Sequence, residues 1–213
     1  MANKKLENCL IVCGAPDIDI DFIKSQLSYY DYIICADSGY SYLKKLNVLP
    51  NLLVGDFDSY SDDLPNTQIV RLNTHKDDTD SIHCCSKAIS LGFKNVTLLG
   101  AIGGRFDHSF ANLCALQYLS ENNINGRILN NTEIIEYKTK GEYKYQNVLN
   151  KTFSVFPFAC KEANVSYIGK CEYPANNLTL KSSLAMGISN VFNEDTVTIK
   201  VNSGNVLIVI EDI

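Results

Sequence analysis

The stretch VTLLGAIGGRFDH, residues 96–108, indicates the fold most clearly. Its first four residues are a short, continuous apolar run, which predicts a strand buried on both faces of a sheet. A glycine-rich turn follows, and apolar residues then recur at helical spacing across 110–119. The stretch therefore predicts a strand, a tight turn and a helix in immediate succession.

The same succession recurs on both sides of that stretch. Apolar runs predict further strands at 10–14, 32–36, 52–55, 69–72 and 127–129, and helical spacing predicts helices at 40–46 and 80–91. Strands that alternate with helices predict a doubly wound, mostly parallel α/β sheet of the Rossmann-like kind. Such a sheet binds its ligands at the carboxyl ends of its strands.

The pattern changes after about residue 130, where helical periodicity stops. Short alternating segments replace it, separated by turn residues such as Gly141 and Gly169; they span 133–138, 151–157, 163–168, 177–181, 195–201 and 206–210. These segments predict a small all-β sandwich or barrel-like domain. We therefore predict an α/β domain at 1–132 and an all-β domain at 133–213. The two are expected to pack together, because no low-complexity linker separates them.

Composition excludes several classes of protein. The chain has 213 residues, of which 46% are hydrophobic and 20% charged, as in an ordinary globular protein. No apolar run approaches the roughly 20 residues that span a bilayer, so we expect a cytoplasmic protein without a membrane partner. The net charge is −5 and no basic patch occurs, which argues against a nucleic-acid partner. The eight cysteines form no Cys-x-x-Cys pair, which favours reduced thiols over disulfides or zinc.

Four polar segments stand out: ADSG (36–39), GDFDS (55–59), KDDTD (76–80) and GGRFDH (103–108). Each lies at or beyond the end of a predicted strand, so a doubly wound sheet brings all four to one rim. The aspartates gathered there would repel one another without a cation; they are Asp37, Asp56, Asp58, Asp77, Asp78, Asp80 and Asp107. Magnesium accepts carboxylates together with substrate phosphates, and an arginine among them suits a phosphate. The set predicts a metal-assisted phosphate site.

Each segment also has a simpler interpretation as a turn or a helix N-terminus, with Asp78, Thr79 or Asp107 as a cap. Missing signatures narrow the alternatives. The chain has no Gly-x-x-x-x-Gly-Lys-Ser/Thr loop, so it is not a P-loop enzyme. It has no Gly-x-Gly-x-x-Gly after the first strand, which disfavours a dinucleotide-binding redox protein, and no Gly-x-Ser-x-Gly elbow for acyl hydrolysis.

In that order and spacing, the four segments resemble the thiamine pyrophosphokinase family. The pairs Phe156-Pro157 and Ser189-Asn190 in the second half also resemble it, so the resemblance covers almost the whole chain. It implies a homodimeric, Mg2+-dependent enzyme that transfers the diphosphate of ATP to the hydroxyl of thiamine and releases AMP. Thiamine would bind between the α/β domain of one subunit and the β domain of the other.

The resemblance also implies roles for individual residues. The metal ligands would be Asp56, Asp58 and Asp80, and with Arg105 these three form the predicted catalytic set. The nucleotide would contact Asp37, Asp56, Lys76, Thr79 and Arg105, and thiamine would contact Asp107, Ser189 and Asn190. The group that accepts the thiamine proton stays open, with Asp80 as one candidate.

The sequence departs from the family in two respects. It has no tryptophan, which some members place against thiamine, and Tyr173 or Phe192 is a candidate replacement. It also has Ser38 where many relatives have glycine. Two other functions stay open: a pyrophosphokinase acting on another alcohol, such as a hydroxymethylpterin, and a non-catalytic sensor of thiamine or a nucleotide. The intact aspartates and arginine of the rim argue against the sensor.

Overall fold

The computed structural model describes residues 7–57, 64–73 and 78–211. Contacts divide the chain into Met1–Asn131, here named the α/β unit, and Thr132–Ile213, here named the β unit. None of the described helices is long and apolar enough to cross a membrane.

The α/β unit contains a six-stranded sheet in the order β6-β5-β1-β2-β3-β4, in which every pairing is parallel. Its strands are β1 (Asn8–Val12), β2 (Tyr32–Ala36), β3 (Leu52–Gly55), β4 (Gln68–Arg71), β5 (Asn95–Leu99) and β6 (Asn125–Leu129). The inner strands are apolar along their length because both faces are covered; Leu10, Ile11 and Leu53, for instance, are fully buried. The predicted parallel α/β sheet is therefore confirmed.

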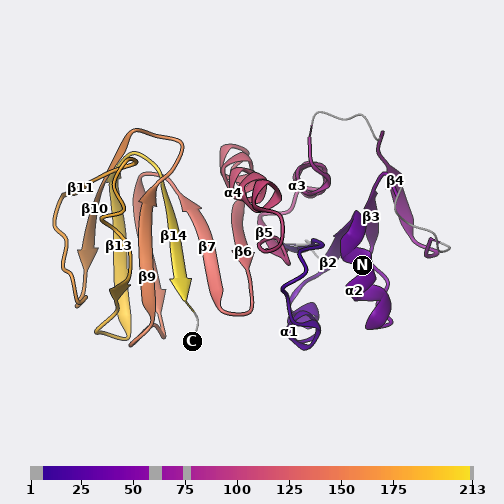
Figure 1. Ribbon diagram of the computed structural model, residues 1–213, viewed down its shortest axis with the longest axis horizontal. Helices are drawn as coiled ribbons and strands as arrows, with labels where there is room; N and C mark the ends of the chain where they lie inside the picture. Colours follow the sequence, from indigo (N-terminus) through magenta and orange to yellow (C-terminus); the bar gives the residue numbers. More distant parts are fainter. Residues whose placement is uncertain (1–6, 58–63, 74–77, 212–213) are drawn as a thin grey trace, which may run out of the picture. The chain divides into compact units, whose positions relative to one another are not determined.

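Helices cover both faces of this sheet. Figure 1 shows α3 (Asp80–Ser90) and α4 (Phe106–Glu121) on one face, and α1 (Ile20–Gln26) and α2 (Tyr40–Lys45) on the other. Two short 3-10 turns, Leu27–Tyr29 and Asp37–Gly39, complete the connections. Helix α4 begins four residues before its predicted start, and α1 was not predicted. Helix α1 has only seven residues and one buried side chain, Ile23, too little for a periodic signal.

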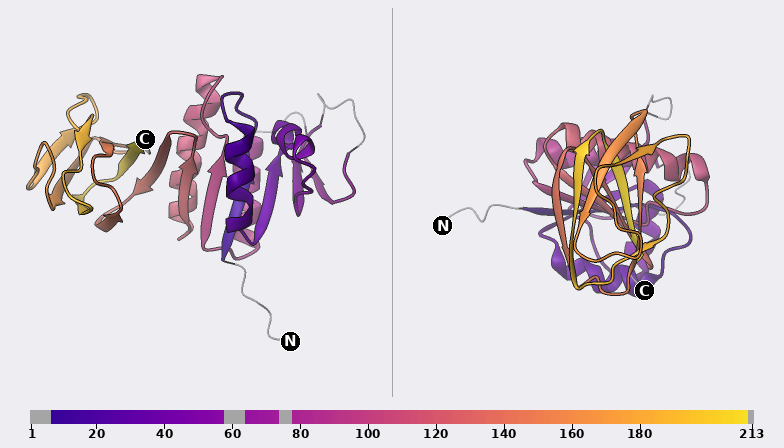
Figure 2. Two further views of the ribbon diagram at one scale, coloured as in Figure 1. Left: turned by 90° about the horizontal axis from the view of Figure 1, so that it is seen from below. Right: turned by 90° about the vertical axis from the view of Figure 1, so that its left-hand side faces the viewer.

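The β unit consists of two antiparallel sheets that share one core (Figure 2). One pairs its strands in the order β12-β9-β14-β7 and the other in the order β11-β10-β13-β8. The strands are β7 (Glu133–Lys138), β8 (Gly141–Gln146), β9 (Thr152–Pro157), β10 (Glu162–Ile168), β11 (Leu178–Lys181), β12 (Asn190–Val191), β13 (Thr196–Ser203) and β14 (Val206–Glu211). The predicted all-β domain is confirmed as a sandwich.

Strand β8 was wrongly predicted as part of a turn, because Gly141 was interpreted as a chain reversal. In the structure Gly141 begins the strand, which pairs with β13 over six residues. Its sequence GEYKYQ alternates: Tyr143 and Tyr145 pack against the core, while the polar residues between them face solvent. The charged residues on its exposed face made this half-buried strand look like a loop in the sequence.

Candidate functional site

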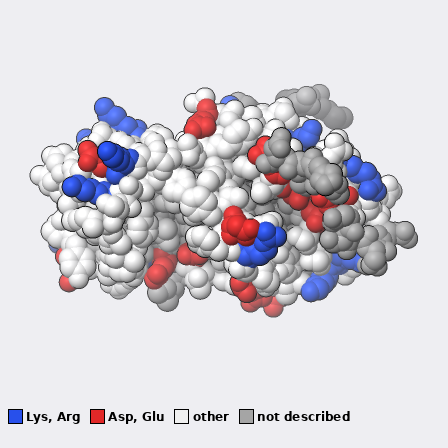
Figure 3. Space-filling view, turned by 45° about the horizontal axis from the view of Figure 1, so that its top comes forward, with Lys and Arg blue, Asp and Glu red and all other residues white. Residues whose placement is uncertain are grey.

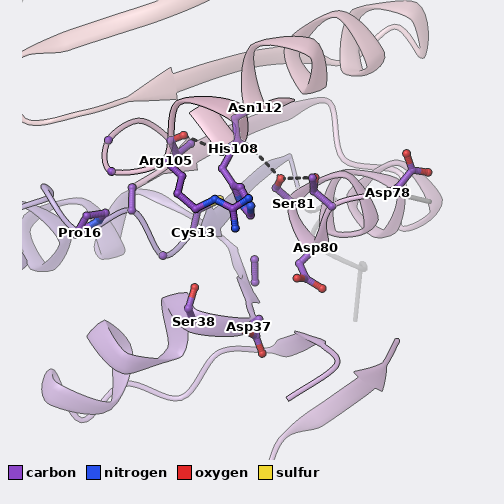
Figure 4. A pocket seen from close by; sticks show the side chains of 18 of the residues that line it. Cys13, Pro16, Asp37, Ser38, Asp78, Asp80, Ser81, Arg105, His108 and Asn112 are labelled. Carbon is purple, nitrogen blue, oxygen red and sulfur yellow. Dashed lines mark hydrogen bonds between the residues drawn. The ribbon is translucent and has the colours of Figure 1, made fainter. Parts of the chain in front are cut away.

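A cavity of about 650 Å³ opens in the α/β unit at the carboxyl ends of its strands (Figure 4). It lies where the strand order reverses, since β1 is flanked by β2 on one side and β5 on the other. Open α/β sheets bind ligands at such a switch point. The walls come from residues 13–16, 36–38, 56, 78–81, 100–101, 103–105, 108 and 112.

Four aspartates, Asp37, Asp56, Asp78 and Asp80, line this cavity from the three segments that follow β2, β3 and β4. Asp37 directly follows β2, and its backbone φ is 24°. The end of β3 approaches it closely: a Cβ on Gly55 would lie 2.8 Å from the Cβ of Asp37, so only glycine fits there. Acids from three segments that are far apart in sequence therefore meet because the strand ends meet.

The backbone beside Asp56 is unusual. Phe57 is buried and has φ 59°, a left-handed conformation that bulky residues rarely adopt. The guanidinium of Arg71 lies 5.5 Å from the centre of its ring. Strain of this kind persists where packing enforces it and is common at functional sites. Here the strained backbone of Phe57 turns the chain directly after Asp56, which lines the cavity.

Arg105 follows two glycines that also need left-handed backbone, Gly103 at φ 124° and Gly104 at φ 63°. The turn is anchored on one side by the Gly104 N–H, which donates to the Asp17 carboxylate at 3.0 Å. On the other side the Gly103 N–H donates to Ser109 Oγ at 3.1 Å. The Arg105 side chain is thus presented to the cavity by a turn that both neighbouring segments hold in place.

The guanidinium of Arg105 forms a two-point ion pair with Asp107, with Nη2 to Oδ2 at 2.6 Å and Nε to Oδ1 at 3.1 Å. The hydrogen bond from Arg105 holds the pKa of Asp107 below its ordinary value, and the same bond raises the pKa of Arg105. Both side chains are largely exposed. Solvent weakens such a pair, so Arg105 can exchange its carboxylate for another anion at small cost.

The start of α3 forms a buried wall of the cavity. Thr79 caps the helix by accepting from the Ile82 N–H at 3.4 Å, and its Oγ1 lies 2.9 Å from Ser81 Oγ. Ser81 Oγ donates to Asn112 Oδ1 at 2.5 Å, and Asn112 Nδ2 donates to the Ala101 carbonyl at 2.7 Å. Figure 4 shows this chain of contacts running from α3 to α4.

Cys13 also lines the cavity and is almost fully buried. Burial, and to a smaller extent the charge of Asp80, raise the pKa of its thiol to about 12. The thiol is therefore neutral at physiological pH and is not suited to act as a nucleophile. All eight cysteines are free, as predicted.

In the β unit, Asn190 is buried and its amide is committed to the backbone. Its Oδ1 accepts from the N–H groups of Tyr173 and Val191, both at 2.9 Å, and its Nδ2 donates to the Tyr173 carbonyl at 2.7 Å. Tyr173 itself is 65% exposed, and Ser189 is also exposed. Phe192 is fully buried and stacks on Phe153 at 4.1 Å, so it lies in the core and not at a surface where a ligand could reach it.

Models of known families match both units. The model described as the thiamin pyrophosphokinase catalytic domain matches residues 23–128, and the one described as its vitamin B1 binding domain matches residues 134–206. The chain belongs to the thiamin pyrophosphokinase family. It therefore has the function of a thiamine pyrophosphokinase, an enzyme that transfers a diphosphate group.

Individual members of the family are similar over nearly the whole chain. Thiamin pyrophosphokinase 1 of Caenorhabditis elegans is 24% identical over 92% of this chain and 88% of its own length. Thiamine pyrophosphokinase of Bacillus subtilis is 26% identical over 84% of this chain and 87% of its own length. Among solved structures, thiamine pyrophosphokinase from Bacillus subtilis superposes with a TM-score of 0.83, covering 96% of this chain and 99% of its own at 23% identity. The yeast enzyme superposes with a TM-score of 0.79, covering 99% of this chain and 87% of its own at 17% identity.

The structure brings most of the predicted nucleotide site together. The cavity is lined by Asp37, Asp56, Thr79, Asp80 and Arg105. Asp107 lies beside Arg105 at the surface, and Ser189 and Asn190 lie in the β unit. Asp58 and Lys76 lie outside the described residues. On the face drawn in Figure 3, a group of acidic side chains lies close together on the α/β unit.

Among the residues that the structure describes, no group of three or more His, Cys, Asp or Glu side chains is arranged to hold a metal ion. The predicted metal set includes Asp58, which is not described, so the set stays a prediction.

The cavity residues that were not predicted include two buried polar ones, Ser81 and Asn112. The sequence did carry a signal for Asn112. The buried face of α4 comprises Asn112, Ala115, Leu116 and Leu119, so an amide occupies a position where helical spacing calls for an apolar side chain. Buried polar residues are hydrogen-bonded, and a polar residue on an apolar stripe therefore indicates a specific partner.

Proposed function

We propose that the cavity of the α/β unit binds ATP, and that the terminal diphosphate passes from it to the hydroxyl of thiamine. The observation that supports this is the convergence of Asp37, Asp56, Asp80 and Arg105 on one cavity at the switch point of the sheet. The N-terminus of α3 lies at the same wall, where the helix dipole favours a polyphosphate. The assignment of ATP rests on this chemistry together with the family's activity.

The carboxylates of the cavity fit a magnesium ion. Four acids lining a polyphosphate site would repel the phosphates, and a divalent cation removes that repulsion. Magnesium takes one or two carboxylates and completes its shell with water and phosphate oxygens, so a complete protein cage is not needed. Asp56 and Asp80, with the undescribed Asp58, would hold the ion. When bound, it offsets the charge of the transferred group and of the leaving AMP.

The residues of the chain then have separate tasks. Arg105 exchanges Asp107 for phosphate oxygens and donates two parallel hydrogen bonds to them. The thiamine oxygen attacks the β-phosphorus in line, a new oxygen–phosphorus bond forms, and the bond from that phosphorus to the oxygen of the α-phosphate breaks. AMP leaves with the bonding electrons. The hydroxyl proton passes to a base for which Asp80 is the candidate, and positioning supplies most of the acceleration.

We propose Ser189 and Tyr173 of the β unit as thiamine contacts, and Asp107 as the contact that the family resemblance implies from the other subunit. Tyr173 is exposed, and Asn190 holds both polar backbone groups of Tyr173. Asn190 would thus act by placing Tyr173 rather than by touching thiamine. A homodimer remains the assembly that the family resemblance implies. We propose a cytosolic location, which the eight free thiols favour because disulfides are rare there.

The purified protein incubated with ATP, Mg2+ and thiamine should yield AMP and thiamine diphosphate in equal amounts, separated by chromatography. Both products should disappear when a chelator is added and return with excess Mg2+. AMP formed only with a hydroxymethylpterin would keep the mechanism and replace the acceptor. Thiamine binding without any AMP would contradict the proposed activity and favour a sensor.

A further inference from the structure

Hydrogen bonds at the buried wall of the cavity fix the directions of two hydroxyl protons, those of Thr79 and Ser81. Asn112 and Ser81 are 7% and 8% exposed, and they are two of only five buried polar residues in the described part of the chain. They contact each other across the gap between α3 and α4. Both line the cavity, although neither has a charge or a role in the reaction as proposed. Their hydrogen bonds can be ordered from one end to the other.

The order starts at a backbone carbonyl. The Ala101 oxygen only accepts, so the Asn112 atom at 2.7 Å from it must be the amide nitrogen. Asn112 Oδ1 therefore faces Ser81, and it too only accepts. At 2.5 Å two lone pairs would repel, so the single Ser81 proton points at Asn112.

The order then passes to Thr79. Ser81 Oγ has no second proton, so at the 2.9 Å contact between the two hydroxyls Thr79 must be the donor. One lone pair of Thr79 Oγ1 accepts from the Ile82 N–H. The remaining lone pair is the only group that this hydroxyl can present to the cavity. The Ala101 carbonyl, in the loop after β5, thus determines whether the Thr79 hydroxyl, at the start of α3, donates or accepts a hydrogen bond at the cavity.

We propose that Asn112 is a positioning residue that acts through Ser81 to turn the Thr79 hydroxyl proton away from the cavity, so that Thr79 meets the ligand as a hydrogen-bond acceptor. This rests on the proposed function, in which the ligand is a metal–nucleotide complex. Thr79 then contacts a group with a proton to give or an empty orbital: a water on the cation, the cation itself, or a nucleotide hydroxyl. It does not donate to a phosphate oxygen.

The direct test is neutron diffraction from crystals of the protein exchanged into D2O. The expected result is a deuterium on Thr79 Oγ1 directed at Ser81 Oγ, and one on Ser81 Oγ directed at Asn112 Oδ1. A Thr79 deuterium directed into the cavity would overturn the proposal. This measurement needs no substrate, so it stands even if the protein fails to make thiamine diphosphate.

The functional test is a double-mutant cycle in kcat/KM for ATP. Ser81→Ala releases the Thr79 proton and should lower kcat/KM about three- to tenfold, the range of a single hydrogen bond. Thr79→Val should lower it about tenfold and Thr79→Ser should restore most of it. In the Thr79→Val background, Ser81→Ala should change kcat/KM by less than about twofold, because Ser81 acts only through Thr79. Equal losses in both backgrounds would contradict the inference.

Matched controls separate positioning from general damage. Ser90→Ala removes a hydroxyl from the other end of α3, where Ser90 Oγ donates to the Lys87 carbonyl. Asn122→Ala removes an amide at the end of α4, where its Nδ2 donates to the Tyr118 carbonyl. Both should leave kcat/KM unchanged. If Ser81→Ala does not fold, Asn112→Ala in the same cycle gives the same discrimination.

Discussion

The cavity has two walls that differ in burial and in charge. One wall is neutral: Ser81 and Asn112 are buried, Thr79 is partly buried, and all three side chains are hydrogen-bonded to specific partners. The other wall carries Arg105, which is exposed and charged, and its ion pair with Asp107 at the surface is screened by solvent. Buried hydrogen bonds are expensive to break, whereas exposed ion pairs exchange readily. The first wall can hold a fixed geometry, and the second can release its arginine to an incoming anion.

The largest expected effect comes from the carboxylates between these walls. Asp80→Asn keeps the size of the side chain and removes its charge, so it should lower kcat by about two to three orders of magnitude. The thermal midpoint should stay close to that of the wild type, because Asp80 lines an open cavity. Asp21→Asn, an exposed change in the first turn of α1, is the control. Near-normal turnover in Asp80→Asn would contradict the assignment of Asp80 as a ligand of the metal ion.

A smaller effect on rate is expected at the exposed wall. Arg105→Ala should lower kcat/KM for ATP by about ten- to a hundredfold, since a charge-assisted contact to phosphate is lost. Stability should not change measurably, because both partners of the ion pair are in solvent. Arg127→Ala, whose side chain bonds Thr97 in a part of the sheet outside the cavity, should leave kcat/KM intact. A large loss of stability in Arg105→Ala would show that this wall is structural.

A substitution in the buried wall should lower the stability of the folded protein. Asn112→Ala leaves the Ser81 hydroxyl and the Ala101 carbonyl without their partner, which should lower the free energy of unfolding by about 1–3 kcal/mol in urea titrations. Asn122→Ala gives the matched value for an exposed amide on the same helix. Equal losses for the two variants would mean that the buried chain is no stronger than a surface contact.

A change that is visible only at high pH is expected from the neutral thiols in the core of the α/β unit. Burial raises the pKa of Cys9 and of Cys13 to about 12 from an ordinary value of 9.0. A raised pKa in the folded state means that stability is full below pH 9 and is lost as the pH rises from 9 to 12. The free energy of unfolding should fall by about 1 kcal/mol per pH unit for each thiol in that window. Cys13→Ala should fall less steeply than wild type; identical slopes would exclude Cys13 as a contributor.

Much of the fold could be predicted from the sequence where one local signal dominated. Strands β2 and β3 begin and end where predicted, because each is a continuous apolar run buried on both faces. Helix α1 was not predicted because its seven residues carry too little periodicity. Strand β8 was not predicted because its charged, exposed face resembles a loop in the sequence. The sequence also indicated that Asp37, Asp56, Thr79, Asp80 and Arg105 gather at one rim, because polar residues clustered after strands are conspicuous, and all five line the cavity.

The sequence by itself determined the family, the alternation that makes the parallel sheet, and the rim where its acids gather. Only the tertiary structure decided which hydroxyl faces which acceptor. Ala101, Ser81 and Asn112 are separated by at least eleven residues, and their hydrogen bonds exist because α3 and α4 pack side by side on one face of the sheet. Likewise, Phe192 and Tyr173 are both aromatic in sequence, and packing alone buried one and exposed the other. Local patterns report the residues of one element, whereas the direction of a proton depends on the partner that a different element supplies.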